Sequence, residues 1–236
     1  MVKAPTFRGM LDVCVHFGHK TSRWHPKMAP YIFTSKSGVH VINLEMTASL
    51  LDSALNFIRN EAAAGKSFVF VGTKKQSGAI VKEAATAAGV SYVNIRWLGG
   101  TITNFDAIRG AVKKYKQQLE ELELSAAGKS ALTKAELSKV RKEVARGEKF
   151  LGGLVNLDRK PDVLVLFGSH DEKNALAEAK VAGIPVVALV DTNTNPTVVE
   201  YPIPANDDAT KSVTLFANLF ADVIKEAREK SAKVEK

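Results

Sequence analysis

The sequence predicts an α/β fold, in which a parallel five-stranded sheet carries helices on both faces and a helical hairpin is inserted into the sheet domain. Short apolar segments alternate with segments of helical periodicity, which is typical of a parallel sheet covered on both sides. Two rows of heptad-spaced apolar residues follow each other in the middle of the chain. No proline occurs between Pro30 and Pro161, so nothing in that stretch forbids helix.

We expect residues 1–36 to form a basic N-terminal arm. This segment mixes Gly, Pro and basic residues and shows no sustained period, which predicts extended, partly irregular structure. It holds six Lys and Arg against one acidic residue, a net charge of +5.

The sheet domain is predicted to comprise residues 37–104 and 151–225. Its helices have apolar residues at helical spacing and cover 45–64, 75–88, 171–182 and about 208–229. Its strands are short apolar segments at 68–71, 92–95, 162–167, 185–190 and 201–204. The last strand contains two prolines, which restricts it to an edge. Five such strands fit the flavodoxin-like order 2-1-3-4-5.

Residues 105–150 are predicted to form an antiparallel helical hairpin with a coiled-coil seam. Apolar residues recur in steps of three and four from Phe105 to Leu122 and again from Leu137 to Leu151, on either side of a turn around Gly128. Basic residues crowd the other faces, which favours a hairpin that projects from the sheet domain over one that lies flat on it. Residues 226–236 are read as a charged tail.

The charge is distributed unevenly along the chain. The first 160 residues hold 25 Lys and Arg against 13 Asp and Glu, a net +12, whereas the last 76 hold 8 against 12, a net −4. We therefore expect a polyanion to bind the N-terminal two thirds, with the acidic C-terminal third facing elsewhere. The alternative is a mildly basic surface that serves solubility.

Composition excludes several classes of protein. Apolar residues make up 45% and charged residues 25%, which rules out a mainly disordered or collagen-like chain. The single cysteine, Cys14, allows no internal disulfide and fits a reducing compartment. We see no signal peptide, and the longest apolar runs are too short to span a bilayer.

The crevice at the carboxyl edge of the sheet is the default ligand site in such a fold. The loop 72–78 is neither a P-loop nor a dinucleotide-binding fingerprint. His170 beside Asp171 could serve acid–base chemistry, but we favour Asp171 as the N-cap of the helix that follows. An enzyme or regulator that binds a nucleotide in this crevice remains the alternative functional class.

Two groups of residues have atoms that can ligate a metal. Cys14, His16, His19 and His25 lie within twelve residues but match no zinc-finger spacing. For Asp191, Asp207 and Asp208 we favour helix capping by Asp207 or Asp208 and solvation over a cation site. We therefore predict no metal and no cofactor.

Basic residues stand next to large aromatic rings in two places. The segments are Arg23-Trp24-His25-Pro26-Lys27 and Arg96-Trp97. Such pairs hold RNA loops, since cations bind phosphates and flat rings stack on unpaired bases. Alternatively, Trp24 and Trp97 are core residues and the arginines are simply solvated.

Several motifs together resemble the bacterial-type ribosomal protein S2 family of the small subunit. They include Val15-His16-Phe17-Gly18-His19, the segment from Trp24 to Phe33, Phe70 to Gln76, the specific block from Arg96 to Phe105, and Tyr201 to Ala209. The resemblance runs from about residue 8 to 225. It implies a flavodoxin-like domain with a protruding coiled-coil hairpin, binding to small-subunit rRNA, and a role in docking ribosomal protein S1.

We therefore expect a non-enzymatic constituent of the cytoplasmic ribosome, in contact with small-subunit rRNA and neighbouring proteins that include S1. We expect neither membrane association nor a homo-oligomer. A weaker alternative is an adaptor that binds only protein through its hairpin. The expected RNA contacts are Arg8, Lys20, Arg23, Trp24, His25, Lys27, Lys36, Lys74, Lys75, Arg96, Trp97, Asn104, Arg109, Lys113 and Lys114.

Overall fold

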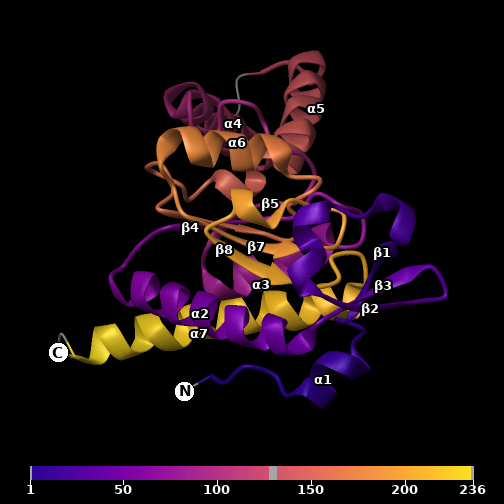
Figure 1. The fold of residues 1–236 in the computed structure, drawn as a ribbon. Helices are drawn as coiled ribbons and strands as arrows, with labels where there is room; N and C mark the ends of the chain where they lie inside the picture. The colour runs from indigo at the N-terminus through magenta and orange to yellow at the C-terminus, as the bar shows by residue number, and fades with distance from the viewer. Residues whose placement is uncertain (1, 128–131, 235–236) are drawn as a thin grey trace.

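The computed structural model describes residues 2–127 and 132–234, and its centre is a parallel five-stranded sheet (Figure 1). The strands are β4 (Phe68–Val71), β5 (Ser91–Val93), β6 (Val163–Leu166), β7 (Val186–Val190) and β8 (Tyr201–Pro204). Their order across the sheet is β5-β4-β6-β7-β8, and every neighbouring pair is parallel. This confirms the predicted flavodoxin-like order, with the proline-containing strand at one edge.

Helices cover both faces of the sheet, as predicted. The helices of the sheet domain are α2 (Leu44–Ala63), α3 (Gly78–Ala88), α6 (Lys173–Ala182) and α7 (Thr210–Val234). Phe68 and Phe70 of β4 pack with buried residues of α2, α3 and α7, while Val69 and Val71 pack on the opposite face with residues of α6. Because both faces are covered, all four residues of β4 are buried and the strand is apolar throughout.

The ends of three helices differ from the sequence prediction. α3 begins at Gly78 rather than near Lys75, and α7 continues to Val234, into the segment read as a tail. α6 begins at Lys173, and Glu172 occupies the N-cap position without a capping hydrogen bond from its side chain. The prediction that Asp171 caps this helix is therefore wrong, and the carboxylate of Asp171 instead pairs with Lys74.

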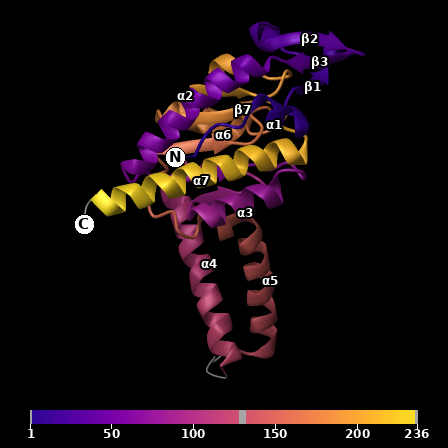
Figure 2. The ribbon, with the colours of Figure 1, turned by 90° about the horizontal axis from the view of Figure 1, so that it is seen from below.

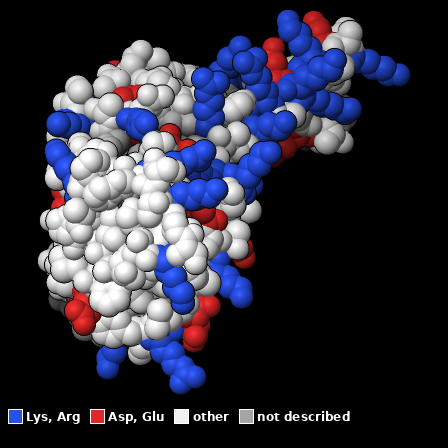
Figure 3. Space-filling view, turned by 45° about the vertical axis from the view of Figure 1, so that its right-hand side comes forward, with Lys and Arg blue, Asp and Glu red and all other residues white. Residues whose placement is uncertain are grey.

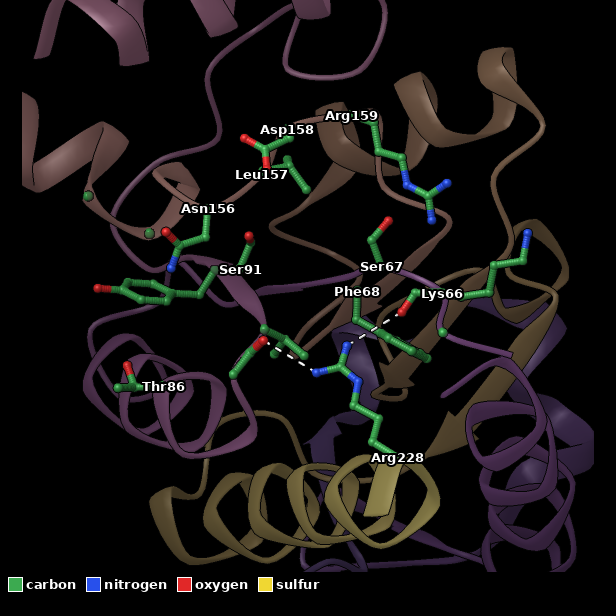
Figure 4. Close-up of a pocket in the computed structure, with 16 residues that line it drawn as sticks. Lys66, Ser67, Phe68, Thr86, Ser91, Asn156, Leu157, Asp158, Arg159 and Arg228 are labelled. Carbon is green, nitrogen blue, oxygen red and sulfur yellow. Dashed lines mark hydrogen bonds between the residues drawn. The ribbon is translucent and has the colours of Figure 1, made fainter. Parts of the chain in front are cut away.

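The last part of α7 is joined to the amino edge of the sheet by Arg228. Its guanidinium donates hydrogen bonds to the carbonyls of Gly89, 3.3 Å away, and Lys66, 3.4 Å away (Figure 4). It also donates to the carbonyl of Ala88, 3.1 Å away. These carbonyls lie at or just beyond the C-terminal ends of α3 and α2, where the helix dipole favours a cation. The guanidinium lies in a cavity of about 470 Å³ and ties three helices together there.

The inserted hairpin consists of α4 (Phe105–Ala126) and α5 (Lys134–Leu151), which project together from the sheet domain (Figure 2). The predicted projection is thus confirmed, while the predicted turn at Gly128 lies outside the described residues. At the base of α4, Phe105, Ile108, Val112 and Tyr115 are buried. No residue of α5 is buried, so the hairpin has a packed root and a solvated shaft.

The N-terminal segment contains a small sheet that the sequence did not predict. α1 (Phe7–Asp12) precedes the antiparallel strands β1 (Phe17–Lys20), β2 (Ile32–Lys36) and β3 (Val39–Ile42), which have the order β1-β3-β2. Short 3-10 helices, Thr21–Arg23 and Pro26–Tyr31, connect β1 to β2. The register of both strand pairs shifts once, and this irregularity explains why no alternating pattern is visible in the sequence.

The N-terminal segment also contributes to the cores of the sheet domain. Met10 and Val15 belong to the core on the α7 side, and Met28 belongs to the core on the α6 side. All three are fully buried. The segment is therefore packed against the body at several points. Within the described residues, no helix is both long and apolar enough to cross a membrane.

Two glycines of the hairpin give a matched test of its packing. A Cβ at Gly147 would lie 2.4 Å from Cδ2 of Tyr115, whereas a Cβ at Gly110 would meet nothing within 4 Å. We expect Gly110→Ala to stabilise α4 by about 0.5–1 kcal/mol, since alanine favours helix. We expect Gly147→Ala to destabilise the hairpin by about 1–3 kcal/mol, because the added methyl group forces the helices apart. Hydrogen exchange of the α4 and α5 amides measures the two effects, and unchanged or increased protection of α5 in Gly147→Ala would contradict the packing described.

Candidate nucleic-acid interface

Most of the cations predicted to contact RNA are exposed. They lie on the N-terminal segment, in the loops that follow β4 and β5, and on the first half of α4, and the exposed ones are Arg8, Lys20, Arg23, Lys27, Lys36, Lys75, Arg96, Arg109, Lys113 and Lys114. In the view of Figure 3, Lys and Arg side chains gather on the projecting hairpin and continue onto the adjoining body. Large parts of the rest of that view carry no charge.

The structure does not bring these cations together in one patch. The hairpin and the small sheet extend from the body in different directions (Figure 2). The loops after β4 and β5 lie at the carboxyl edge of the parallel sheet, where strand ends meet. The cations therefore form an elongated, discontinuous surface, which suits a large folded polyanion better than a small ligand.

The loop between β5 and α4, which contains Arg96, is held by one carboxylate of α6. Oε1 of Glu178 accepts hydrogen bonds from Nε1 of Trp97 at 3.0 Å and from the backbone N–H of Gly100 at 2.8 Å. Oε2 accepts from the backbone N–H groups of Ile102 at 3.0 Å and Thr103 at 3.2 Å. Burial by itself raises the pKa of Glu178, but these hydrogen bonds to the charged form outweigh it and lower that pKa.

Trp97 lies in the core, as the alternative interpretation of this residue expected, and its ring offers little surface on which a base could stack. The residue is only 6% exposed, its ring packs in the core beneath the hairpin root, and its N–H is used by Glu178. The neighbouring Arg96 is exposed. Asn104, at the N-cap position of α4, is also exposed and makes no capping hydrogen bond with its side chain.

The other tryptophan lies at the surface. Trp24 is 40% exposed, and its ring centroid is 5.4 Å from that of His40. The next residue, His25, is half-buried and its Nδ1 accepts a hydrogen bond from the backbone N–H of Lys27. His25 therefore has a local structural role, whereas Trp24 has a face available to solvent.

Lys74 does not belong to the exposed cations. Its ammonium lies 2.7 Å from Oδ1 of Asp207, 2.8 Å from Oδ1 of Asp208 and 3.2 Å from Oδ2 of Asp171. Burial opposes the charge of the ammonium, but the attraction of Asp207 and Asp208 is stronger and raises the pKa of Lys74. Lys74 therefore differs from the other cations predicted to contact phosphate, because carboxylates already surround its ammonium.

These carboxylates also correct the expectation that the acidic C-terminal third faces away from the basic segments. His19 of β1 places Nδ1 3.0 Å from Oδ1 of Asp191 and Nε2 3.3 Å from Oδ2 of Asp208. The hydrogen bond to Asp191 raises the pKa of His19, despite partial burial. Arg23 lines a neighbouring cleft of about 700 Å³ together with Asp171 and Asp208. Acidic and basic groups thus meet at the carboxyl edge.

This cleft is poorly suited to a nucleotide. The backbone N–H of Thr73, in the loop after β4, donates to Oε1 of Glu172 at 2.7 Å and is therefore not free for a phosphate. The carboxylates of Asp171 and Asp208 line the cleft, and the ammonium of Lys74 there is already paired with both of them. The geometry favours a structural joint over the nucleotide site that the sequence left as an alternative.

The candidate metal ligands are dispersed or otherwise engaged. Across residues 2–127 and 132–234, no three His, Cys, Asp or Glu side chains form a group that could hold a metal ion. The carboxylates of Asp207 and Asp208, for which the sequence favoured a capping role, instead contact Lys74 and His19. Oδ1 of Asn206 accepts hydrogen bonds from the backbone N–H groups of Asp208 and Ala209, in the turn before α7 begins at Thr210.

Sequence reasoning missed Glu178, which positions the loop of Arg96. It is an ordinary acidic residue in a predicted helix, 81 positions from Trp97, so no local pattern marks it. The cluster of five hydrogen bonds to one carboxylate exists only after the two segments have folded together.

Comparison with known proteins agrees with this architecture. The model of the family described as ribosomal protein S2 matches residues 10–227. The chain is 48% identical over 219 residues to small ribosomal subunit protein uS2 of Microcystis aeruginosa, covering 93% of this chain and 82% of that protein. It is 47% identical over 226 residues to uS2 of Synechococcus elongatus, covering 95% and 89%. It is 49% identical over 220 residues to uS2 of Thermosynechococcus vestitus, covering 93% and 82%. The chain therefore belongs to the ribosomal protein S2 family, which consists of structural proteins of the ribosome and not of enzymes.

Proposed function

We propose that this chain is held in the small ribosomal subunit by contacts between its exposed cations and rRNA. As a member of the ribosomal protein S2 family, it is a structural constituent of the small subunit of the cytoplasmic ribosome, and it works in translation. The single observation that carries the proposed rRNA contact is that most of its exposed cations have no carboxylate partner. Eight of them make no ion pair within the described part of the chain, namely Arg8, Lys20, Arg23, Lys27, Lys36, Lys75, Arg96 and Lys113.

Solvated cations without a carboxylate partner are free to neutralise phosphates, which releases the counterions condensed on the nucleic acid. Their positions on the small sheet, the carboxyl-edge loops and the hairpin supply contacts at separate points of a folded RNA. The hairpin cations Arg109 and Lys114 have acidic neighbours, at 3.3 Å and 4.0 Å respectively. Both pairs are exposed at the surface, where such pairs contribute little stability, so both cations remain available for phosphate.

Replacing one cation in each of two regions tests the proposed interface. We expect Arg23→Ala combined with Arg96→Ala to weaken binding to small-subunit rRNA and to reduce the slope of log affinity against log salt by roughly 2 units. The measurement is a filter-binding or anisotropy titration at several salt concentrations, together with incorporation into reconstituted subunits. The matched control is Lys173→Ala combined with Lys180→Ala on α6, which should leave both readouts unchanged. Normal affinity and slope in the arginine pair would place the RNA interface elsewhere.

The loop of Arg96 depends on an ionised Glu178, which predicts a pH dependence. The hydrogen bonds put the folded pKa of Glu178 below its ordinary value of 4.5. The carboxylate therefore stabilises the fold above pH 4.5, and this contribution is lost as pH falls through the lower, folded pKa. We expect Glu178→Gln to lower the free energy of unfolding at pH 7 by about 1–3 kcal/mol, because an amide cannot accept all five bonds.

Denaturant titrations of wild type and variant at pH 7 and at acidic pH measure this effect. The difference between the two proteins should shrink on the acidic side, where the wild-type carboxylate becomes protonated. Glu83→Gln on α3 is the control, since its side chain is exposed. A pH-independent difference would show that Glu178 acts through packing and not through its charge.

We further propose that an apolar surface around α1 receives ribosomal protein S1, the partner that the family resemblance implies. Phe7 and Leu11 stand four residues apart on α1 and are 50% and 48% exposed. Val13, just after α1, lines an adjoining cavity of about 330 Å³ with Thr210, Thr214 and Leu215 of α7. Exposed apolar groups at this spacing support contact with a protein and not with phosphates.

A charge placed on this apolar surface should weaken the proposed contact with S1 and leave the proposed contact with rRNA intact. We expect Leu11→Glu to reduce retention of S1 on reconstituted subunits by at least about ten-fold, since burying an unpaired carboxylate opposes docking. Incorporation of the variant into the subunit should remain normal, because α1 contributes few of the cations. Val181→Glu, at a 79% exposed position of α6, is the control. Full retention of S1 by the Leu11 variant would contradict this docking site.

A further inference from the structure

The cavity at the amino edge of the sheet is lined by three cations that have no part in the proposed rRNA interface. Its volume of about 470 Å³ lies in the range of small-molecule sites. The cations are Lys66, Arg159 and Arg228, and among the described residues that line the cavity Asp158 is the only acid. The cavity lies at the start of β4 and β5, whereas Lys74 and its carboxylates lie at the opposite, carboxyl edge.

Arg228 is a partly buried cation without a full negative charge beside it. Its three hydrogen bonds go to backbone carbonyls, and no carboxylate forms an ion pair with it within residues 2–127 and 132–234. Burial lowers the pKa of Arg228, and no neighbouring charge offsets that effect. A buried arginine is normally paired with an acid, and a guanidinium has more N–H donors than these three bonds use. The side chain is therefore complementary to an anion.

The other two cations share one carboxylate. Nη2 of Arg159 lies 3.0 Å from Oδ2 of Asp162, and Nζ of Lys66 lies 3.5 Å from its Oδ1. Oδ2 also accepts hydrogen bonds from the backbone N–H and the hydroxyl of Ser67, at 2.8 and 2.7 Å. In Figure 4, the side chains of Arg159 and Arg228 enter the cavity from opposite sides. The single charge of Asp162 cannot balance both of its cations, so the cavity keeps a surplus of positive charge.

Ser91 adds a hydroxyl that has no partner. The residue begins β5, is 8% exposed and lines the cavity, and its hydroxyl makes no hydrogen bond within the described part of the chain (Figure 4). A buried hydroxyl is normally hydrogen-bonded, so this one is available to a ligand. Val90, Tyr92 and Leu157 line the cavity as well and supply apolar surface next to the donors. This mixture suits an anion that carries an organic group.

We propose that this cavity binds a phosphomonoester, whose phosphate oxygens accept hydrogen bonds from Arg228, Arg159 and Ser91 while its organic part lies on the apolar surface. Phosphate fits donors on facing walls because its oxygens are arranged tetrahedrally, whereas a planar carboxylate pairs with a single guanidinium. Asp158 is exposed, so it weakens the binding of an anion without blocking the cavity. Small phosphorylated molecules and the 5′-phosphate end of an RNA share this group, and the test separates them.

The test titrates the full chain with adenosine 5′-monophosphate, inorganic phosphate and adenosine at constant ionic strength. Calorimetry measures affinity, and NMR follows the backbone amides of Ser67, Gly89 and Ser91. We expect saturable binding of the monophosphate with shifts of these amides, weaker binding of inorganic phosphate at the same residues, and none of adenosine. Arg159→Gln should weaken binding by about ten-fold or more, because a charge-assisted hydrogen bond is lost. Asp158→Asn should strengthen it by about two-fold or more, because a repelling charge is removed.

Both substituted side chains are exposed, so neither variant should unfold the protein, and their opposite effects distinguish a phosphate site from a purely structural role of Arg228. Lys180→Gln on α6 is the matched control and should leave affinity unchanged. An equal loss in this control would overturn the inference, since it would show general attraction to a basic protein. Absence of binding by both phosphates up to about 10 mM would overturn it as well.

A short RNA with and without a 5′-phosphate identifies the source of the group. Tighter binding of the phosphorylated form, lost in Arg159→Gln, would support the cavity as a site for an RNA end. Equal binding of the two RNAs, with the monophosphate still bound at Ser91, would support a site for small molecules. The inference does not rest on the proposed rRNA contact, because Arg23→Ala combined with Arg96→Ala should leave monophosphate affinity unchanged.

Discussion

The ammonium of Lys74 and the carboxylates around it form the contact on which the arrangement of this molecule depends. Lys74 follows the central strand β4, and its partners Asp207 and Asp208 lie 133 and 134 residues further along the chain. Asp191, next to the buried Asp207, binds His19 and so attaches the first strand of the small sheet. Removing a cation from water costs free energy, so Lys74 stays charged in its partly buried position only because these carboxylates surround it. The carboxyl edge of the sheet, where such folds usually bind a ligand, here holds the N-terminal and C-terminal parts of the chain together.

Because carboxylates pair with Lys74 at the sheet edge, the cations that remain unpaired lie at the periphery of the molecule. They lie on the small sheet, the loop of Arg96 and the hairpin, which are the parts that extend from the body or border its edge. A rigid sheet domain with two projections presents cations at distant points. The hairpin is anchored by the cluster that contains Phe105 and Tyr115, and the Arg96 loop at the sheet edge is held by Glu178.

The two tryptophans show how an aromatic residue beside an arginine can have opposite roles. Trp97 lies in the core and donates its N–H to Glu178, so it helps to hold the loop of Arg96. Trp24 keeps an exposed face, and Phe33 on the edge strand is more exposed still. The pairing of a cation with a ring in the sequence therefore does not tell which ring faces solvent.

The sequence by itself determined the α/β class, the strand order, the edge position of β8 and the projecting hairpin, because these follow from local periodicity and from proline and glycine positions. It also located most of the exposed cations, since charged side chains without partners stay in water. Only the tertiary structure decided the roles of Lys74, Trp97 and Glu178, whose hydrogen-bond partners lie 75 to 134 residues away. The small sheet was likewise hidden, because its strands are short and their register shifts erase the alternating pattern. Long-range pairing of charges and hydrogen bonds leaves no trace in local spacing, and for that reason these features had to be seen in the fold.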